Sequence, residues 1–423
     1  MHMLLPMIYQ RCLQLLVDVS EASVLLQKQI LKIFFALVQY FLPLDLISKE
    51  TFAQWMDLFR TIVDRPVPDI WNFNQIFKKL YKREFSKTYG SPNKVSKEYR
   101  EFADYYLHAF SGGILEVMLK VLLMYKQKLF VSSRVLQQAL NYINQAVNHA
   151  FSWKFLKVHM MPIIQDVIFP LMCYTDQDED LWNTDPHEYI RLKFDVFEDF
   201  ISPVTAAQSL LHSAVKKRKE ILPNSMGFVM SILTDPNSNP RQKDGALHMV
   251  GTVANILMKK PVFKEQMETM LVTYVYPEFE SPHGFMRARA CWVLHYFSEI
   301  KFQNETNLIH ALGLTQHCLL NDKDMPVKVE AAIALQMLIT NQEKAKRYIE
   351  PKIKPIALEL LNIMRETEND DLTTVMQKIV CTYSKELMPI AVEMTRHLVR
   401  IFQNYTSSKC IYIILNLFLI FCK

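Results

Sequence analysis

The densest group of side chains with potential for chemistry is an acidic run between residues 175 and 186. The run reads Thr-Asp-Gln-Asp-Glu-Asp-Leu-Trp-Asn-Thr-Asp-Pro, and four of its carboxylates are Asp176, Asp178, Glu179 and Asp180. Carboxylates beside a helix N-terminus are stabilised by the positive end of the helix dipole. The same side chains could instead dock a basic protein partner. The sequence favours an exposed loop between helices, and we keep these four residues as candidate protein-binding residues.

A basic segment with interleaved aromatic residues lies between residues 78 and 100. It holds eight Lys and Arg residues against two Glu residues. Such a mixture can bind phosphates and stack bases. However, Phe77, Tyr81 and Phe85 recur at helical spacing, which is typical of rings packed in a core with lysines on the solvated face. We therefore expect no nucleic-acid partner.

The motifs of known catalytic centres are absent from the sequence. It contains no glycine-rich phosphate loop, no Gly-x-Ser-x-Gly elbow and no His-Glu-x-x-His pair. The 12 histidines are dispersed, and the 7 cysteines are scattered without a Cys-x-x-Cys pair. The sequence therefore predicts no catalytic residue, no cofactor and no metal site. The cysteine pattern is typical of a reducing compartment.

The elements that must position these groups are repeated amphipathic helices. Five segments place mostly apolar residues at i, i+4, i+7, i+8 and i+11, which form one stripe of a helix. Successive segments are separated by 52, 44, 41 and 45 residues. Turn-forming or helix-capping residues stand five positions before most stripes. The first stripe residues are Ile190, Gln242, Met286, Val327 and Leu372, and the preceding turn residues are Asp185, Asn237, Ser281, Asp322 and Thr367.

A basic residue follows the first stripe residue in four of the five segments. These residues are Arg191, Lys243, Arg287 and Lys328. The position lies off the buried stripe, at the start of the second helix of each predicted pair. Second helices of stacked pairs line the concave face of a solenoid, where such proteins bind their ligands. We therefore predict that these four residues contact a protein partner.

Length, composition and period together indicate the fold class. The chain has 423 residues, is 50% hydrophobic and has only 8 glycines. A period of about 40 to 47 residues built from helix pairs is typical of HEAT and armadillo repeats. We predict an all-α HEAT-repeat α-solenoid, a superhelix of antiparallel helix pairs, over residues 1–403. Residues 404–423 form a divergent apolar tail, whose uncharged stretch 411–421 is too short to span a bilayer. We expect no membrane insertion.

Several longer stretches are similar to one family. Residues 90–99, 194–203, 244–248, 286–296 and 325–335 closely resemble importin-β-type nuclear transport receptors. The resemblance lies in the branch of importin-seven and importin-eight, with the importin-eight side nearer, and covers residues 1–403. Residues 182–191, beside the acidic run, resemble the matching element in this branch and in the export receptor for importin-α.

The resemblance implies a receptor that carries protein cargo through nuclear pores. It implies contacts with FG-repeat nucleoporins, release of cargo under control of the Ran GTPase, and shuttling between cytoplasm and nucleus. The chain departs from the family at both ends. We therefore expect a central part or truncated isoform in which Ran binding is weakened or lost, with the tail as a substitute ending. Repeat periodicity alone leaves one alternative open, a generic HEAT scaffold for a multiprotein complex.

Overall fold

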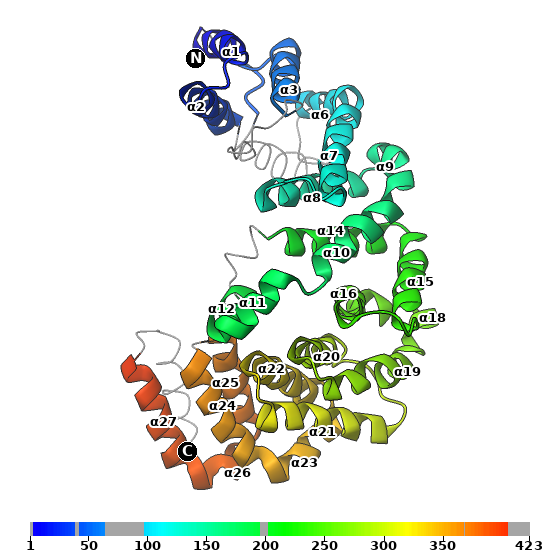
Figure 1. The fold of residues 1–423 in the computed structure, drawn as a ribbon, viewed down its shortest axis with the longest axis vertical. Helices are drawn as coiled ribbons and strands as arrows, with labels where there is room; N and C mark the ends of the chain where they lie inside the picture. Colours follow the sequence, from blue (N-terminus) through cyan, green and yellow to red (C-terminus); the bar gives the residue numbers. More distant parts are fainter. Residues whose placement is uncertain (1–2, 39–41, 64–96, 195–201, 368, 405–423) are drawn as a thin grey trace. The chain divides into compact units, whose positions relative to one another are not determined.

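The computed structural model describes residues 3–38, 42–63, 97–194, 202–367 and 369–404 (Figure 1). Within these ranges every regular element is a helix, as predicted. The chain divides into two compact units. Unit 1 comprises Met1–Ile168 and Ile201–Ile221, and unit 2 comprises Phe169–Phe200 and Leu222–Lys423. Most of the basic segment 78–100, with its aromatic residues, and the tail 405–423 lie outside the described residues.

Among the residues that the structure describes, the apolar faces of α1, α2, α3 and α6 meet in one core of unit 1. In the first part of the unit, the fully buried Trp55 stacks on Phe34 with ring centroids 4.2 Å apart. The described helices of this unit are α1 (Leu4–Leu15), α2 (Glu21–Val38), α3 (Lys49–Val63), α6 (Lys97–Ala109), α7 (Ser111–Lys126), α8 (Ser133–Asn148), α9 (Ala150–Ile163), η1 (Ile164–Ile168) and α14 (Pro203–Lys217).

In unit 1, a side chain that follows α14 forms hydrogen bonds with the end of α8. Helix α8 packs between α7 and α14 and buries Leu136, Leu140 and Ile143. Arg218, the residue after α14, donates from its guanidinium to the carbonyl oxygens of Val147 and His149. Carbonyl groups at a helix C-terminus have no partner within the helix. Arg218 therefore satisfies the end of α8 from the following repeat.

Unit 2 is also built from helix pairs. Its longer helices are α11 (Asp176–Thr184), α12 (Pro186–Phe194), α15 (Ile221–Leu233), α16 (Pro240–Thr252), α20 (Gly284–Tyr296), α21 (Glu305–Asn321), α22 (Met325–Asn341), α24 (Ile353–Thr367), α25 (Asp370–Thr382) and α27 (Ala391–Asn404). Short helices connect them: α10 (Phe169–Met172), α17 (Ala254–Leu257), α18 (Pro261–Lys264), α19 (Met267–Met270), η2 (Leu271–Val275), η3 (Tyr276–Glu280), α23 (Glu343–Ile349), η4 (Glu350–Lys352), α26 (Ser384–Leu387) and η5 (Met388–Ile390).

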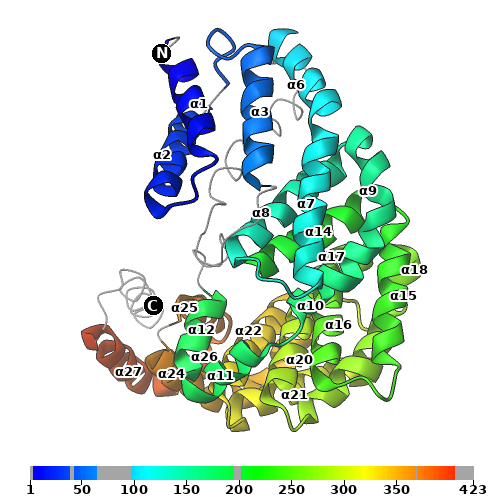
Figure 2. The same cartoon turned by 45° about the horizontal axis from the view of Figure 1, so that its top comes forward.

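Three of the predicted stripes, on α20, α22 and α25, are buried faces of second helices in unit 2, and so is the stripe on α16 apart from its first residue, Gln242, which is exposed. The stripe that begins at Ile190 lies on α12, which packs on α22 and α24, and its residues after Phe194 fall outside the described ones. Helices α16, α20, α22 and α25 pack on one another in succession, with α21 against α22 and α24 against α25 (Figures 1 and 2). In α22 the stripe residues Val327, Ala331, Ala334, Leu335 and Leu338 are all fully buried. The predicted spacings of 44, 41 and 45 residues are thereby confirmed for the segments from Gln242 to Leu372.

Four helix starts lie two residues later than the predicted turn residues. The N-caps of α16, α20, α22 and α25 are Asn239, His283, Asp324 and Asn369. In α16 and α22 a proline occupies the first turn, where its fixed φ and missing N–H are tolerated. Asp185 is as predicted, because its carboxylate accepts the N–H of Glu188 at 2.9 Å.

One described helical run, Ala150–Thr184, is long and apolar enough by composition to cross a membrane. The core helix of a soluble protein passes the same test, so the match is weak evidence. Several of its residues are core residues here, since Leu156, Met160 and Ile164 are fully buried within the helical array.

Candidate functional site

The acidic run forms a helix, so the predicted loop is wrong. Thr175 is the N-cap of α11, and its hydroxyl accepts the N–H of Asp178 at 3.1 Å. The Asp178 carboxylate accepts the N–H of Thr175 at 3.0 Å, which completes a capping box. Three acidic residues in the first turn complement the helix dipole. Helices α11 and α12, joined at Asp185, form a hairpin that we call the acidic hairpin (residues 174–194).

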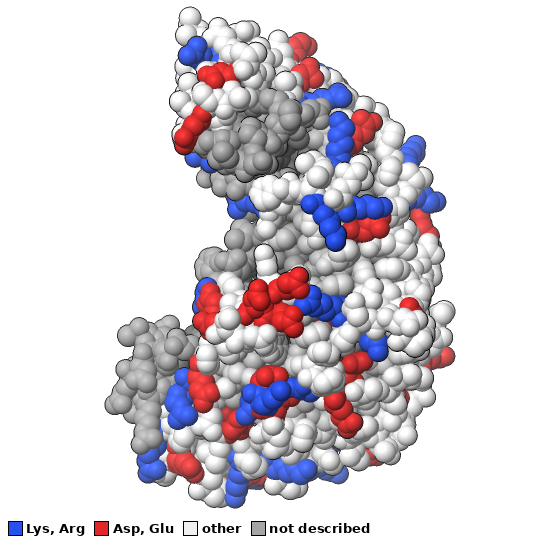
Figure 3. All heavy atoms as spheres, in the orientation of Figure 1, with Lys and Arg blue, Asp and Glu red and all other residues white. Residues whose placement is uncertain are grey.

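Arg241, at the start of α16, neutralises the exposed side of the hairpin. Its Nη1 and Nη2 donate to the carboxylates of Asp176 and Glu179, both at 2.5 Å. The hydrogen bond to Asp176 is the main reason that the pKa of Arg241 is raised. Asp180 is exposed and makes no ion pair among the described residues. Figure 3 shows the acidic side chains gathered at α11 with basic side chains beside them.

A second ion pair links the two helices of the hairpin. Lys193 of α12 donates to Asp178 at 2.9 Å. Burial favours the protonated carboxyl of Asp178, but Lys193 and the hydrogen bonds from Thr175 outweigh this and lower its pKa. The pair therefore stays charged at neutral pH and fixes α12 against α11.

Aromatic rings anchor the hairpin on α20. Tyr174 stacks on Phe285 with centroids 4.0 Å apart and planes at 8°. Trp182 meets Tyr174 edge-on at 6.3 Å and Tyr189 at 5.0 Å. A Cβ atom on Gly284 would lie only 2.8 Å from the Trp182 ring, so the absence of a side chain at this position lets Trp182 approach α20.

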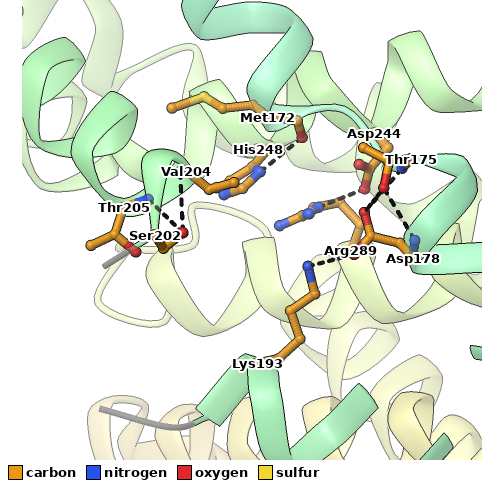
Figure 4. Close-up of polar contacts among 10 residues, drawn as sticks. All are labelled: Met172, Thr175, Asp178, Lys193, Ser202, Val204, Thr205, Asp244, His248 and Arg289. Atoms are coloured by element: carbon orange, nitrogen blue, oxygen red, sulfur yellow. Dashed lines mark hydrogen bonds and ion pairs between the residues drawn. The ribbon is translucent and has the colours of Figure 1, made fainter. Parts of the chain in front are cut away.

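Beneath the hairpin lies a buried ion pair between two second helices. Arg289 of α20 donates to Asp244 of α16 at 2.7 Å (Figure 4). The Arg289 guanidinium also lies 4.8 Å from the Trp292 ring centroid. Burial raises the pKa of Asp244. Burial alone would lower the pKa of Arg289, but the ion pair with Asp244 outweighs this and raises it. The other Asp244 oxygen, Oδ2, is buried without a hydrogen-bond partner. His248 donates from Nδ1 to the Met172 carbonyl oxygen at 2.9 Å, and burial holds its pKa well below its usual value.

The four predicted basic residues are engaged to different degrees. Arg287 is only 11% exposed and binds Asp322 and Asp324, at 2.6 and 2.9 Å. Lys328 is 17% exposed and binds Glu359 of α24 at 2.5 Å. These two side chains connect successive repeats, and their contact with a partner remains a prediction.

The other two basic residues are more accessible. Arg191 pairs with Glu188 of its own helix at 2.6 Å, with 58% of its side chain exposed. Lys243 forms no ion pair in the described part of the chain, and its charge opposes the burial that raises the pKa of Glu278. The structure therefore places the acidic run and Arg241 together, but it does not gather the four basic residues into one site.

Sequence reasoning missed the charges that line the second helices. Lys193, Arg289 and Glu330 each stand three residues after the first stripe residue of their segment, and Asp244 precedes the equivalent Gly245. Burial raises the pKa of Glu330 to about 7, although Arg289 opposes this. The available signal was a charge three residues after the first stripe residue in three of the five segments.

Unit 1 holds a separate, mostly apolar pocket. Helices α6 and α7 meet at a bend of 51°, and a cavity of about 130 Å³ opens between this bend and α3. Asp57 and Arg60 are its charged residues. Gly113 lies on its wall, and no atom lies within 4 Å of a Cβ built there. The apolar wall includes Met56, Phe110, Ile114, Val117 and Met118.

Comparison with known proteins identifies relatives over nearly the whole chain. Importin-8 of Homo sapiens is 54% identical, and the match covers 96% of this chain and 41% of that protein. A probable importin-7 homolog of Dictyostelium discoideum is 28% identical over 92% of this chain and 39% of its own length. The chain thus spans about two fifths of the length of these relatives. No family model matches.

The fold has a counterpart among solved structures. A crystal structure of Kap121p bound to Pho4p matches 96% of this chain and 37% of that chain, with a TM-score of 0.55 and 14% sequence identity. At this identity the likeness concerns the fold alone, and it agrees with the predicted HEAT-type solenoid. The chain is thus similar to importin-8, at 54% identity over 96% of this chain and 41% of importin-8.

Proposed function

We propose that this chain forms part of a nuclear transport receptor that binds protein cargo and FG-repeat nucleoporins under control of the Ran GTPase. The observation that supports the proposal is the 54% sequence identity to importin-8 over 96% of the chain. In this role the chain binds and releases proteins without catalysing a reaction, and it shuttles between cytoplasm and nucleus.

The pocket in unit 1 supports a contact with FG repeats. An FG repeat presents a phenylalanine side chain, which gains free energy when an apolar cavity removes it from water. The pocket lies between α3 and α7, and α7 is the first helix of the pair it makes with α8. Pockets between first helices are where the importin resemblance places phenylalanines of nucleoporins. We therefore assign this pocket as the FG contact to be tested.

Two neighbouring glycines give a matched test of this assignment. Gly113 lines the pocket, whereas Gly112 does not, and a Cβ at either position meets no atom within 4 Å. Both lie in the first turn of α7. Leucine at either site also improves helix propensity. Gly113→Leu should fill the pocket and weaken binding of an FG-repeat peptide about tenfold, the effect of losing roughly 1.4 kcal/mol. Gly112→Leu should leave the affinity unchanged.

Fluorescence anisotropy measures the affinity of each variant for a labelled FG-repeat peptide. A pull-down with GTP-loaded Ran tests binding of Ran by the unmodified chain. Binding of the peptide by the unmodified chain supports the transport role. If both leucine variants bind the FG peptide with equal affinity, the peptide binds outside this pocket. If neither the peptide nor Ran binds, the chain behaves as a generic HEAT scaffold and the proposal fails.

A further inference from the structure

Helix α9 of unit 1 exposes an apolar stripe. Phe151, Phe155, Val158 and Pro162 stand at i, i+4, i+7 and i+11, which places them on one face of the helix. Phe155 and Val158 are 51% and 73% exposed, whereas Met160, on the opposite face, is fully buried. A helix at the surface of a globular protein usually carries polar residues on its outer face. The α9 stripe, as we call these four residues, is therefore a second apolar face of the helix.

Two lysines line one edge of the α9 stripe. Lys154 and Lys157 precede Phe155 and Val158 by one position each, so both lie on the same side of the stripe. Both lysines are exposed. Lys157 forms an ion pair with Glu220 at 3.7 Å, with the two side chains 62% and 42% exposed. A pair this exposed contributes little stability, so Lys157 remains able to bind another carboxylate.

The segment after α14 extends this basic edge. Two contacts place it beside the first turns of α9: the ion pair of Glu220 with Lys157, and the Arg218 guanidinium 4.6 Å from the Trp153 ring centroid. Arg218 itself is engaged with the carbonyl groups at the end of α8. With the two lysines of α9, the exposed lysines of this segment form what we call the basic band. They are Lys216, Lys217 and Lys219.

Few acidic residues balance the basic band. Helices α9 and α14 contain no Asp or Glu, and Glu220 is the one acidic residue among residues 216–220. Within the part of the chain that the structure describes, the contact of Lys157 with Glu220 is the only ion pair of the band. The band therefore concentrates positive charge beside an exposed apolar surface. Such a charge distribution attracts an acidic partner and selects against a basic one.

We infer that the α9 stripe and the basic band together form a docking site for an acidic amphipathic helix of a protein partner. Apolar residues at i, i+4 and i+7 of the partner pack on the stripe, and Asp or Glu residues along one edge pair with the band. Helix α9 has 14 residues, which matches a partner helix about 20 Å long.

Two further observations define the occupant. A helix that lies on a membrane carries its cations on a broad polar face opposite the apolar one, whereas the opposite face of α9 is buried in the core. The geometry therefore favours a protein helix over a lipid surface. The site also shares no residue with the pocket between α3 and α7, so this inference goes beyond the proposed contact with FG repeats.

The probe is a designed, fluorescein-labelled peptide of about four helical turns. It carries leucines at i, i+4, i+7 and i+11 and glutamates along one edge, and a twin peptide carries lysines in place of the glutamates. Fluorescence anisotropy measures the binding of both peptides to the full chain. The unmodified chain should bind the glutamate peptide saturably, and the lysine peptide at least about tenfold more weakly.

Two valines of nearly equal exposure test the stripe. Val158→Glu should weaken binding of the glutamate peptide at least about tenfold, because an apolar contact is lost and a like charge is added. Val262→Glu changes a valine of α18 that is 74% exposed and should leave the affinity unchanged. Gly113→Leu, which fills the pocket in unit 1, should also leave it unchanged because the two sites are separate.

A charge exchange tests the basic band. Lys154→Glu with Lys157→Glu should weaken binding of the glutamate peptide and strengthen binding of the lysine peptide, each at least about fivefold. The gain with the lysine peptide also shows that the chain is folded. Lys259→Glu with Lys264→Glu makes the same change in net charge on two other lysines and should alter neither affinity.

Three results would overturn the inference. The first is absence of saturable binding of the glutamate peptide to the unmodified chain. The second is equal affinity of Val158→Glu and Val262→Glu, or of the two double lysine variants, for that peptide. The third is co-sedimentation of the unmodified chain with phosphatidylserine vesicles that Val158→Glu abolishes, which would assign the site to a lipid surface.

Discussion

At the scale of single residues, one ion pair of unit 2 lies in the interior of the helix pairs, between α16 and α20. Asp244 and Arg289 form their pair with only 2% and 19% of their side chains exposed. Transfer of charges out of water is costly, and the attraction between them offsets the cost only while both are present. Removing one partner should therefore cost more than removing both.

Arg289→Met should lower the free energy of unfolding by about 3–5 kcal/mol, because Asp244 would then be a buried, unpaired carboxylate. The double variant Asp244→Asn with Arg289→Met should recover part of this loss. Urea unfolding measures both. Lys344→Met provides the control, since the Lys344–Glu305 pair is 67% and 55% exposed and should contribute less than about 1 kcal/mol. Equal losses in Lys344→Met and Arg289→Met would contradict the role of burial.

Glu330 should make stability depend on pH near neutrality. Burial raises the pKa of this carboxyl from 4.5 to about 7 in the folded chain. Its contribution to stability is therefore full below pH 4.5 and is lost as the pH rises through 7. Relative to Glu330→Gln, the unmodified chain should lose about 1–3 kcal/mol between pH 5 and pH 8. Parallel stability curves for the two proteins would show that Glu330 titrates normally.

Two glycines within helices should respond to alanine with opposite signs. A Cβ on Gly251 would lie 2.2 Å from the rigid Trp292 ring, whereas a Cβ on Gly227 meets nothing within 4 Å. Gly251→Ala should destabilise the chain by about 1–3 kcal/mol through overpacking. Gly227→Ala should stabilise it by about 0.5–1 kcal/mol through helix propensity. Thermal unfolding distinguishes the two, and a gain in Gly251→Ala would mean that Trp292 moves freely.

At the scale of elements, the C-terminus of α7 shows how a helix end is fixed by backbone hydrogen bonds. Helix α7 ends in a Schellman motif, in which Leu129 N–H donates to Met124 C=O at 3.0 Å and Lys128 N–H to Tyr125 C=O at 2.9 Å. Lys128 has φ +59°, a left-handed conformation in which a Cβ is unfavourable. The motif thus places a lysine where glycine is preferred.

Lys128→Gly should stabilise the chain by about 1 kcal/mol, because glycine adopts this conformation without a steric penalty. Lys128→Ala keeps the Cβ and should show no such gain. Differential scanning calorimetry of both variants makes the comparison. A similar gain in Lys128→Ala would assign the effect to the lysine charge instead of the backbone.

Faces of helices could be predicted from the sequence, and their long-range polar partners could not. The stripe of α22 was predicted because burial in a helix imposes a period that any reader of the sequence can detect. The capping box of Thr175 was missed, although its pattern is local, because the acidic residues were interpreted as a loop. The pairing of Arg241 with Asp176 spans 65 residues. A surface charge has many possible partners, so only the fold selects one.

At the scale of the whole molecule, the acidic hairpin joins repeats that a simple solenoid would leave independent. In a one-dimensional array, stability is a sum over repeats and their nearest neighbours. Contacts of α12 with α22 and α24 add a term between distant repeats of unit 2. A destabilising substitution in α12 should therefore also lower the stability of the distant helices α22 and α24.

Ile190→Ala tests this coupling, because Ile190 is the buried residue of α12, at 1% exposure. Truncation should cost about 2–5 kcal/mol. Amide exchange should rise in α22 and α24 as well as in the hairpin. Val229→Ala in α15, also 1% exposed, is the matched control and should leave α24 unchanged. Confinement of the Ile190→Ala effect to residues 174–194 would show that the hairpin is not coupled to the distant repeats.

The seating of α12 on α24 also sets an order of events during synthesis. Helix α12 ends at Phe194 and α24 begins at Ile353. Ribosomes add about 5–20 residues per second, so translation of the intervening chain takes on the order of 10–30 s. Throughout this interval α12 lacks its contact with α24, whereas Trp182 can meet Gly284 as soon as α20 has been made. The nascent chain therefore presents an apolar, acidic hairpin to chaperones until the last of its contacts emerges from the ribosome.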